Sequence, residues 1–282
     1  MPPTLSAAGR LVRQHDHDRF LTTLFAPADR REDLLALYAF NHEVAKTREA
    51  VSEPLLGRIR LQWWRDGVSA IYAGDRPRHH EVIEPLAAAI QRHDLDRTQF
   101  ERLIDARELD LAEEPPASLA ALESYAEGSS AALLRLALAI LGVRDEAALA
   151  AANAAGIGFA LAGLLRAIPS HARARRAYLP ADLAAAAGLH YERDLFALKS
   201  APALRAAVAA VAEAASGHLR AAAERRGRVS RAAVPPLLLA TLARADLARL
   251  RRAGYDPFAP QLAAADPRRS WRLTLAAFTG RF

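Results

Sequence analysis

The chain has 282 residues and a formal net charge of +6, with 52% hydrophobic, 25% charged and 6% aromatic residues. It contains no cysteine, which excludes disulfides, thiolate catalysis and cysteine-ligated zinc or iron–sulfur centres. Alanine and leucine far outnumber β-branched residues, and this composition favours helices because both side chains lose little entropy there. We therefore predict an all-α fold in one domain spanning residues 1–282, with residues 1–14 as a loosely ordered N-terminal segment.

Helical spacing of apolar residues recurs along the chain, and no alternating strand pattern stands out. The spacing is clearest within residues 100–111, 133–141 and 237–250. Prolines and glycines separate such stretches, and Ser118, two residues after Pro116, is placed to cap the next helix. The pattern predicts about eight to ten helices.

Three short motifs have ordinary structural explanations. Residues 15–18 read His-Asp-His-Asp and residues 79–80 are both histidine, but each group lies at a terminus or beside turn residues, where solvated side chains are expected. We therefore expect no metal site there. Gly156, Gly158 and Gly163 lie inside a helical run with no preceding strand, so they indicate close helix packing rather than a nucleotide loop.

The pI is about 10.1, and arginines cluster within residues 173–176, 225–231, 249–252 and 268–272. Two interpretations stay open: a compositional drift towards arginine, or a basic surface for anionic lipid or an acidic partner. No stacking aromatics are interleaved with the arginines, so nucleic-acid binding is not expected. No signal peptide is recognised, and the longest apolar run, within residues 154–165, is too short to span a bilayer, which predicts a cytoplasmic location.

Four separate sequence blocks carry one family resemblance. They lie at residues 20–40, at 61–74, at 103–111 with 125–128, and at 156–180. In order and spacing they resemble the squalene/phytoene synthase family over nearly the whole chain. The resemblance implies an isoprenoid synthase-like helical bundle around a central cavity. It also implies the family's reaction, in which Mg²⁺ held by aspartates on two facing helices neutralises the diphosphate that leaves a prenyl substrate.

The first aspartate-rich motif implied by the resemblance is degenerate. It follows residues 38–40, Tyr-Ala-Phe, and its acidic positions hold Ala45, Lys46 and Glu49. One carboxylate remains, and the lysine cation opposes magnesium binding.

The second motif has lost its carboxylates altogether. It follows Arg166, and its first and last acidic positions hold Ala167 and His171, with a helix-breaking Pro169 between them. We therefore expect no catalytic residue, no metal ion and no other cofactor, with Mg²⁺ required only if the protein is a prenyltransferase after all.

Several polar side chains around these positions remain candidates for lining a cavity or binding a ligand. They are Tyr38, Asn41, Glu49, Asp105, Glu108, Asp110, Arg166, Arg173 and Tyr178. Asp105 and Glu108 lie one helical turn apart and, with Asp110, could retain some cation binding. The alternative for these three is a solvated or salt-bridged helix face.

The chain also matches a smaller group within the family, and in that group the motif carboxylates are missing at the same positions. The matching residues lie within 39–45, 51–53, 62–64, 125–127, 165–171 and 178–182. At these positions the chain resembles a non-catalytic branch of the family, the mitochondrial complex I (NADH:ubiquinone oxidoreductase) assembly factor 6-like proteins.

These resemblances support two hypotheses. The first is a non-catalytic family member that acts in complex I (NADH dehydrogenase) assembly or binds a lipid or isoprenoid. Its partners would be an NADH dehydrogenase subunit or assembly partner, a lipid or prenyl ligand, and the inner face of the membrane as a peripheral contact. The second is a divergent Mg²⁺-dependent prenyltransferase that joins two prenyl diphosphates.

Overall fold

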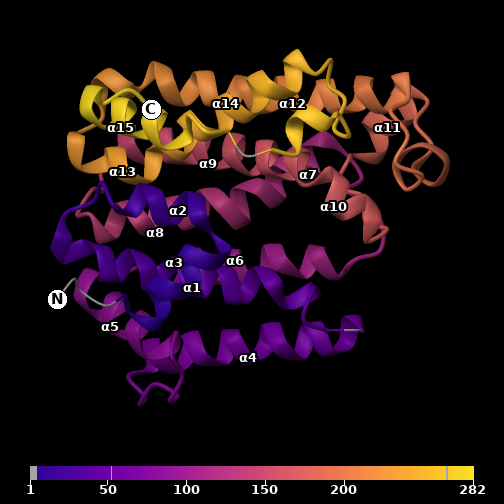
Figure 1. The fold of residues 1–282 in the computed structure, drawn as a ribbon. Helices are drawn as coiled ribbons and strands as arrows, with labels where there is room; N and C mark the ends of the chain where they lie inside the picture. Colours follow the sequence, from indigo (N-terminus) through magenta and orange to yellow (C-terminus); the bar gives the residue numbers. More distant parts are fainter. Residues whose placement is uncertain (1–4, 52, 265) are drawn as a thin grey trace.

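Helices make up all the regular secondary structure in residues 5–51, 53–264 and 266–282, the parts of the chain that the computed structural model describes (Figure 1). The all-α prediction is confirmed. The α-helices are α1 (Ala7–His15), α2 (His17–Thr23), α3 (Arg31–Ala45), α4 (Pro54–Ala73), α5 (Ile83–His93), α6 (Arg97–Glu108), α7 (Leu119–Ala126), α8 (Ala132–Ile140), α9 (Glu146–Arg166), α10 (Ile168–Arg173), α11 (Ala181–Ala187), α12 (Pro202–Glu224), α13 (Val234–Leu237), α14 (Leu239–Arg252) and α15 (Arg269–Thr279). Fifteen α-helices in these residues exceed the predicted number, because the shortest ones span too few turns to show an apolar period.

The N-terminal segment is helical rather than loosely ordered. Ser6 caps α1, since its Oγ accepts a hydrogen bond from the Gly9 N–H at 3.0 Å. The helix packs closely on α3, where a Cβ at Gly9 would come within 3.3 Å of the Leu35 Cδ1. The prediction for residues 1–14 is therefore wrong from residue 5 onwards, and residues 1–4 lie outside the described residues.

Helix α8 joins two hydrophobic clusters. Leu134 and Leu138 pack into the cluster built largely from α9, α12 and α14, whereas Leu133, Leu136 and Ile140 pack into the cluster built largely from α1 and α3–α6. A period of 3.6 residues puts these two sets on different faces of α8. Because both faces are covered, α8 is buried and holds the two halves of the core together.

Helix α9 runs through the middle of the molecule, between α8 on one side and α12 with α14 on the other (Figure 1). Two glycines permit this close packing. A Cβ at Gly156 would lie 2.5 Å from the Ala131 Cα, and one at Gly158 would lie 2.6 Å from the Leu219 Cγ. Nothing lies within 4 Å of a Cβ at Gly163. The packing prediction is thus confirmed for the first two glycines and wrong for the third.

Helix α9 is also long and apolar enough to cross a membrane by length and composition, so the apolar stretch is longer than the sequence analysis allowed. In the structure 61% of its apolar window is buried. Its neighbours on both sides are other helices of the core, and a buried core helix passes the same test of length and composition. We therefore assign α9 to the core.

Two predicted helix boundaries are confirmed. The Ser118 Oγ accepts a hydrogen bond from the Ala121 N–H at 3.2 Å and so caps α7. Pro169 lies in the first turn of α10, and α9 ends before it at Arg166. The chain therefore changes from one helix to another inside the second motif.

Candidate functional site

The first motif lies at the end of α3, where its lysine is held in a local ion-pair cluster. Ala45 is the last residue of α3 and Lys46 opens a single 3₁₀ turn. The Lys46 Nζ contacts Glu43 Oε1, and the Arg60 Nη2 donates to the other carboxylate oxygen at 2.8 Å. Glu43 is only 7% exposed, whereas the Lys46 and Arg60 side chains are each 32% exposed, so a buried carboxylate binds two partly exposed cations. Glu49, the one carboxylate left at the motif positions, is exposed.

A closed charge network holds the end of α9 to segments near both ends of the chain. The Arg166 Nη1 lies 3.2 Å from Asp18 Oδ2 and 2.8 Å from Asp246 Oδ2. Arg269 of α15 reaches the same two carboxylates, with its Nε 2.7 Å from Asp18 Oδ1 and its Nη1 3.2 Å from Asp246 Oδ1. We call these four residues the Asp18 network. Burial would raise the pKa of Asp18, but its hydrogen bonds to Arg269 and Arg166 and their charges outweigh burial and hold this pKa below its ordinary value.

Residues 15–18 are therefore not simply solvated, and that prediction is wrong for Asp18, which is buried. Asp16 caps α2 by accepting from the Arg19 N–H at 3.3 Å and also contacts the Arg19 Nη1 at 2.6 Å. The His15 ring stacks on the ring of His42, with centroids 4.5 Å apart. These side chains hold the N-terminal helices against α3, next to the first motif.

The last position of the second motif, His171, adjoins Asp110, a buried carboxylate and a predicted cation-binding candidate. Asp110 Oδ1 accepts hydrogen bonds from the Tyr178 hydroxyl at 2.7 Å and from the Tyr125 hydroxyl at 2.9 Å. The Arg107 Nη1 lies 3.3 Å from Asp110 Oδ2. We call Asp110 and these partners the Asp110 cluster. Three of the roughly four acceptor sites of this carboxylate are taken, and the residue is 5% exposed, so it is poorly placed to bind a metal ion.

Burial beside the Asp110 cluster keeps His171 uncharged near neutral pH, although the Asp110 carboxylate itself acts to raise the pKa of His171. The imidazole packs against the Tyr178 ring at a centroid distance of 4.7 Å. Burial lowers the pKa of His171 to about 4, with a further contribution from the nearby Arg176 guanidinium. Burial also raises the pKa of Tyr178 and of Tyr125. The imidazole is therefore neutral near pH 7, and both tyrosines keep the protons that they donate.

Asp105 and Glu108 do not join Asp110. Both are held by Arg65 of α4, whose Nη2 lies 2.6 Å from Asp105 Oδ1 and 2.9 Å from Glu108 Oε1. Their side chains are 62% and 52% exposed. The salt-bridged helix face is therefore the correct interpretation for these two carboxylates and the wrong one for Asp110.

Tyr38 and Asn41 lie inside the molecule on α3. Tyr38 is 1% exposed, and the guanidinium carbon of Arg19 lies 5.8 Å from the centroid of its ring. Burial, as the largest cause, raises the pKa of Tyr38. The Oδ1 of Asn41 is buried without a hydrogen-bond partner among the described residues, and so is the Nδ1 of His171, so each of these two predicted positions leaves a polar atom unsatisfied.

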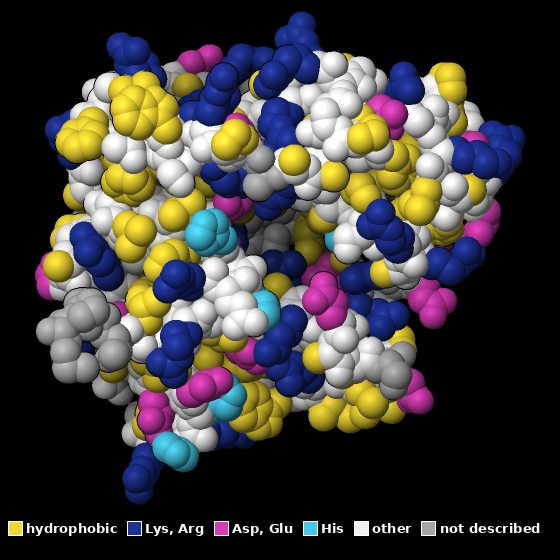
Figure 2. Space-filling model, viewed as in Figure 1, with side chains coloured by type: hydrophobic (Ala, Val, Ile, Leu, Met, Phe, Trp, Pro, Cys, Tyr) yellow, Lys and Arg dark blue, Asp and Glu magenta, His cyan; other side chains and the backbone are white. Residues whose placement is uncertain are grey.

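A cavity of about 830 Å³ lies beside the second motif, and Arg166 and Arg173 both line it. Its charged lining consists of Asp16, Asp18, Asp246, Asp266, Arg166, Arg173, Arg249 and Arg269, equal numbers of carboxylates and guanidinium groups. Leucines, prolines and alanines supply most of the remaining surface, together with Phe258. In Figure 2 the molecule is hollowed near the centre of the face in view, with Lys and Arg side chains around the hollow. We call this space the second-motif cavity; its size suits a ligand with an apolar body.

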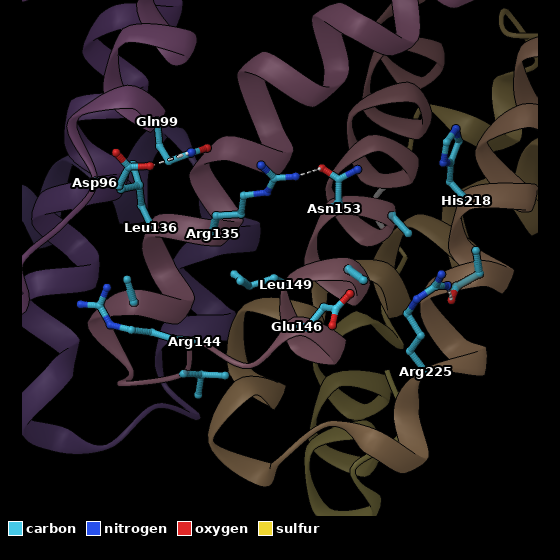
Figure 3. A pocket seen from close by; sticks show the side chains of 15 residues that line it. Asp96, Gln99, Arg135, Leu136, Arg144, Glu146, Leu149, Asn153, His218 and Arg225 are labelled. Atoms are coloured by element: carbon cyan, nitrogen blue, oxygen red, sulfur yellow. Dashed lines mark hydrogen bonds between the residues drawn. The ribbon is translucent and has the colours of Figure 1, made fainter.

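A second cavity, of about 720 Å³, lies at the other end of α9, against α8 and α12. Figure 3 shows Arg135 of α8 pointing to Asn153 of α9, and their hydrogen bond measures 2.8 Å. Leu136 and Leu149 lie on the same lining, and Arg144 and Arg225 stand at its edges. None of the predicted site residues lines this cavity, so the degenerate motifs and this space are separate features.

The residues at the motif positions do not fit a magnesium cluster. Mg²⁺ needs hard oxygen ligands in near-octahedral geometry, and the motif positions offer only the exposed Glu49. Glu43, Asp18 and Asp110 are each held by arginine, lysine or tyrosine donors. Within the described ranges, no three His, Asp or Glu side chains lie together in a group that could hold a metal ion.

The architecture is that of a helical isoprenoid synthase. The squalene synthase HpnC from Alicyclobacillus acidocaldarius superposes with a TM-score of 0.78, at 22% sequence identity, over 89% of this chain and 94% of that one. The squalene/phytoene synthase family model matches residues 12–278. The chain therefore belongs to the squalene/phytoene synthase family, as its sequence blocks predicted.

Two curated relatives of this chain have names that indicate different functions. The NADH dehydrogenase (ubiquinone) complex I assembly factor 6 of Rattus norvegicus is 34% identical over 252 residues, which cover 89% of this chain and 75% of that protein. A presqualene diphosphate synthase of Sinorhizobium fredii is 27% identical over 165 residues, 58% of each chain. The predicted resemblance to complex I assembly factors within the family is confirmed.

Proposed function

We propose that this protein is a non-catalytic family member that acts in the assembly of respiratory complex I (NADH dehydrogenase), in the cytoplasm and peripherally at the inner face of the membrane. One observation carries the proposal: the charged groups at and behind both motifs are bound to one another. Arg166 is held by two aspartates, Lys46 by Glu43, and His171 packs against Tyr178 of the Asp110 cluster.

The expected loss in reaction rate follows from the need of a leaving diphosphate for electrostatic stabilisation. Losing a single electrostatic stabiliser in an active site costs about 100- to 1,000-fold in rate. Here both metal motifs are degenerate, and Arg166 already has two carboxylate partners. A diphosphate would therefore compete with internal carboxylates for Arg166, and no metal ion or other cofactor is part of the proposal.

The assembly role is supported by the relatives named as assembly factors, since similarity to the rat protein extends over 89% of this chain. We propose an NADH dehydrogenase subunit or another assembly protein as the partner. We further propose that the second-motif cavity, with its mixed apolar and charged lining, accepts a lipid or prenyl ligand without turning it over.

The test is deletion of the gene in its host, followed by native gel electrophoresis of membranes and assay of NADH dehydrogenase activity. We expect the mature complex to decrease and assembly intermediates to accumulate. Complementation should succeed with the wild-type gene and equally with Glu49→Gln, which removes the last carboxylate of the first motif. Normal complex I in the deletion strain would contradict the proposed pathway.

Prenyl transfer is the second candidate, and the similarity to the presqualene diphosphate synthase supports it. Purified protein is incubated with Mg²⁺ and farnesyl or geranylgeranyl diphosphate, and the products are analysed by mass spectrometry. We expect no coupled product. Turnover that requires Mg²⁺ and disappears in Glu49→Gln would overturn the non-catalytic proposal and restore the enzyme.

A further inference from the structure

Helix α15 is apolar on two faces, and the rest of the protein covers only one of them. Leu273 and Ala276 are buried, at 1% and 5% exposure. Trp271, Leu275 and Phe278 are 71%, 56% and 77% exposed. Their spacing of four and three residues puts them on one side of the helix. In Figure 2 large hydrophobic side chains stand out at the place that α15 occupies in Figure 1. Such a contiguous exposed apolar surface marks an interaction site.

The positive charge of the protein is concentrated in the part of the chain that contains α15. Residues 225–282 hold 12 arginines and three aspartates, with no lysine or glutamate. Residues 1–224 hold 26 Lys and Arg against 29 Asp and Glu, so they contribute none of the positive excess. The basic pI is thus a local property and not a uniform drift in composition.

Arginines stand at both ends of the exposed face of α15. Arg268 precedes the helix and Arg281 follows it, and both are exposed. Arg231 is exposed as well, and its Nη2 donates to the carbonyl oxygen of Phe278, which places its charge beside the apolar face. Among the described residues these three arginines form no ion pair with a carboxylate. Their charges are therefore available to anions outside the protein.

A second exposed apolar group shows what distinguishes α15. Leu55 and Ile59, at the start of α4, are 61% and 58% exposed. The exposed carboxylates of Glu49 and Glu53 lie just before them in the chain, and Arg58 is the one charged residue between them. The α4 group is comparably apolar but has neighbours of both charges, whereas the α15 face has basic ones.

We infer that the exposed face of α15 docks on an anionic lipid bilayer, with Trp271, Leu275 and Phe278 in the interfacial region and Arg231, Arg268 and Arg281 on the lipid phosphates. Tryptophan and phenylalanine on one side of a basic helix are the composition of helices that lie in a membrane interface.

Docking in this orientation brings the second-motif cavity to the membrane. Arg269, the first residue of α15, and Asp266 just before it both line that cavity. A lipid or prenyl ligand could then exchange between the bilayer and the cavity over a short path. The inference gives a physical basis to the membrane location in the proposed function, but it rests on α15 and not on the loss of catalytic residues.

The experiment measures co-sedimentation of the full-length protein with vesicles of phosphatidylcholine alone, or with phosphatidylglycerol at about 30% of the lipid, the range in which anionic headgroups attract basic segments. The wild-type protein should bind only the anionic vesicles, less at high salt. Trp271→Ser with Phe278→Ser should weaken binding by at least about tenfold. Arg268→Gln and Arg281→Gln should each weaken it about fivefold.

The matched control is Leu55→Ser with Ile59→Ser, which removes comparable apolar surface on α4 and should leave vesicle binding unchanged. All the substituted side chains are exposed, so thermal melts should stay close to that of the wild type. Absence of binding to anionic vesicles, or equal effects of the α15 and α4 variants, would overturn the inference. An α15 variant that still binds vesicles but loses a complex I subunit in pull-downs would also overturn it, in favour of a protein partner.

This experiment is separable from the test of the proposed function. Vesicle binding needs no other protein, whereas complementation of the deletion strain does. If vesicle binding fails while the α15 variant still restores complex I, only the membrane face is refuted. If vesicle binding holds while the deletion strain has normal complex I, only the assembly role is refuted.

Discussion

Replacing Asp18 by asparagine tests whether the Asp18 network holds the ends of the chain to α9. Asp18→Asn keeps the shape of the side chain but leaves Arg166 and Arg269 with Asp246 as their one remaining carboxylate partner in the network. The side chains of Asp18 and Arg269 are 11% and 17% exposed, so the uncompensated charge is largely cut off from water.

The expected loss in the free energy of unfolding follows from this burial. Removing one partner of a buried ion pair costs about 3–5 kcal/mol, because the remaining charge stays desolvated. Arg166 is 49% exposed and can regain water, so the expected loss in the free energy of unfolding is about 2–4 kcal/mol. For a chain of this size that corresponds to a fall in Tm of roughly 3–7 °C.

The pH dependence of the same variant gives a second readout. The pKa of Asp18 lies below its ordinary value of 3.8 in the folded protein. A carboxyl with a lowered folded pKa stabilises the protein above its ordinary pKa, and that stabilisation is lost as the pH falls through the folded value. The difference between Asp18→Asn and wild type should therefore be constant between about pH 5 and 7 and shrink below about pH 4.

Urea denaturation followed by circular dichroism measures both effects, and Asp105→Asn is the matched control. Asp105 also pairs with an arginine, at 2.6 Å, but its side chain is 62% exposed, so its loss should cost no more than about 1 kcal/mol. Equal losses for the two variants, or a Asp18→Asn deficit that persists unchanged at pH 3, would refute the claim that a desolvated network at Asp18 stabilises the fold.

Four further results are expected. Gly158→Ala should lose about 1–3 kcal/mol by urea denaturation, because its Cβ would lie 2.6 Å from Leu219 Cγ, whereas Gly163→Ala has free space and should gain up to about 1 kcal/mol. The imidazole of His171 has a pKa of about 4, so it should stay neutral by NMR at pH 5.5, and wild-type stability should rise with pH between about 4 and 6.5, a slope that His171→Gln removes. Tyr178→Phe should cost about 1–3 kcal/mol, since it takes a donor from a buried carboxylate. Addition of MgCl₂ should leave the Tm unchanged, because a ligand raises the Tm only when it binds the folded state, and a saturable rise would reveal a metal site.

Local features of the fold could be predicted from the sequence because their causes are local. Ser118 caps the helix that directly follows it, and Pro169 ends α9 a few residues before its own position. The glycines at 156 and 158 stand out within a helical run, where only close packing explains them. The short helices escaped prediction, since a helix of two turns shows no apolar period.

The networks at the site could not be predicted because their partners are far apart in sequence. Asp18 lies 148 residues from Arg166 and 251 residues from Arg269. The sequence shows an acidic residue near the N-terminus and arginines elsewhere, and a solvated position is the ordinary expectation for each. The resemblance to the family indicated that carboxylates were missing at the motifs, but only the tertiary structure shows which cations the surviving carboxylates bind.

The charged groups behind the two motifs support a common explanation. A diphosphate site assembled from aspartates carries excess negative charge until metal ions arrive, and that repulsion destabilises the folded protein. In this chain the cations are covalently part of the protein: Arg166 and Arg269 bind Asp18 and Asp246, while Lys46 and Arg60 bind Glu43. Each network is satisfied without a ligand, so the fold no longer needs metal or substrate to balance its interior charge. The same internal pairing that stabilises the empty protein occupies Arg166, Arg269 and Lys46, so the proposed loss of catalysis and the retention of the fold are consistent with each other.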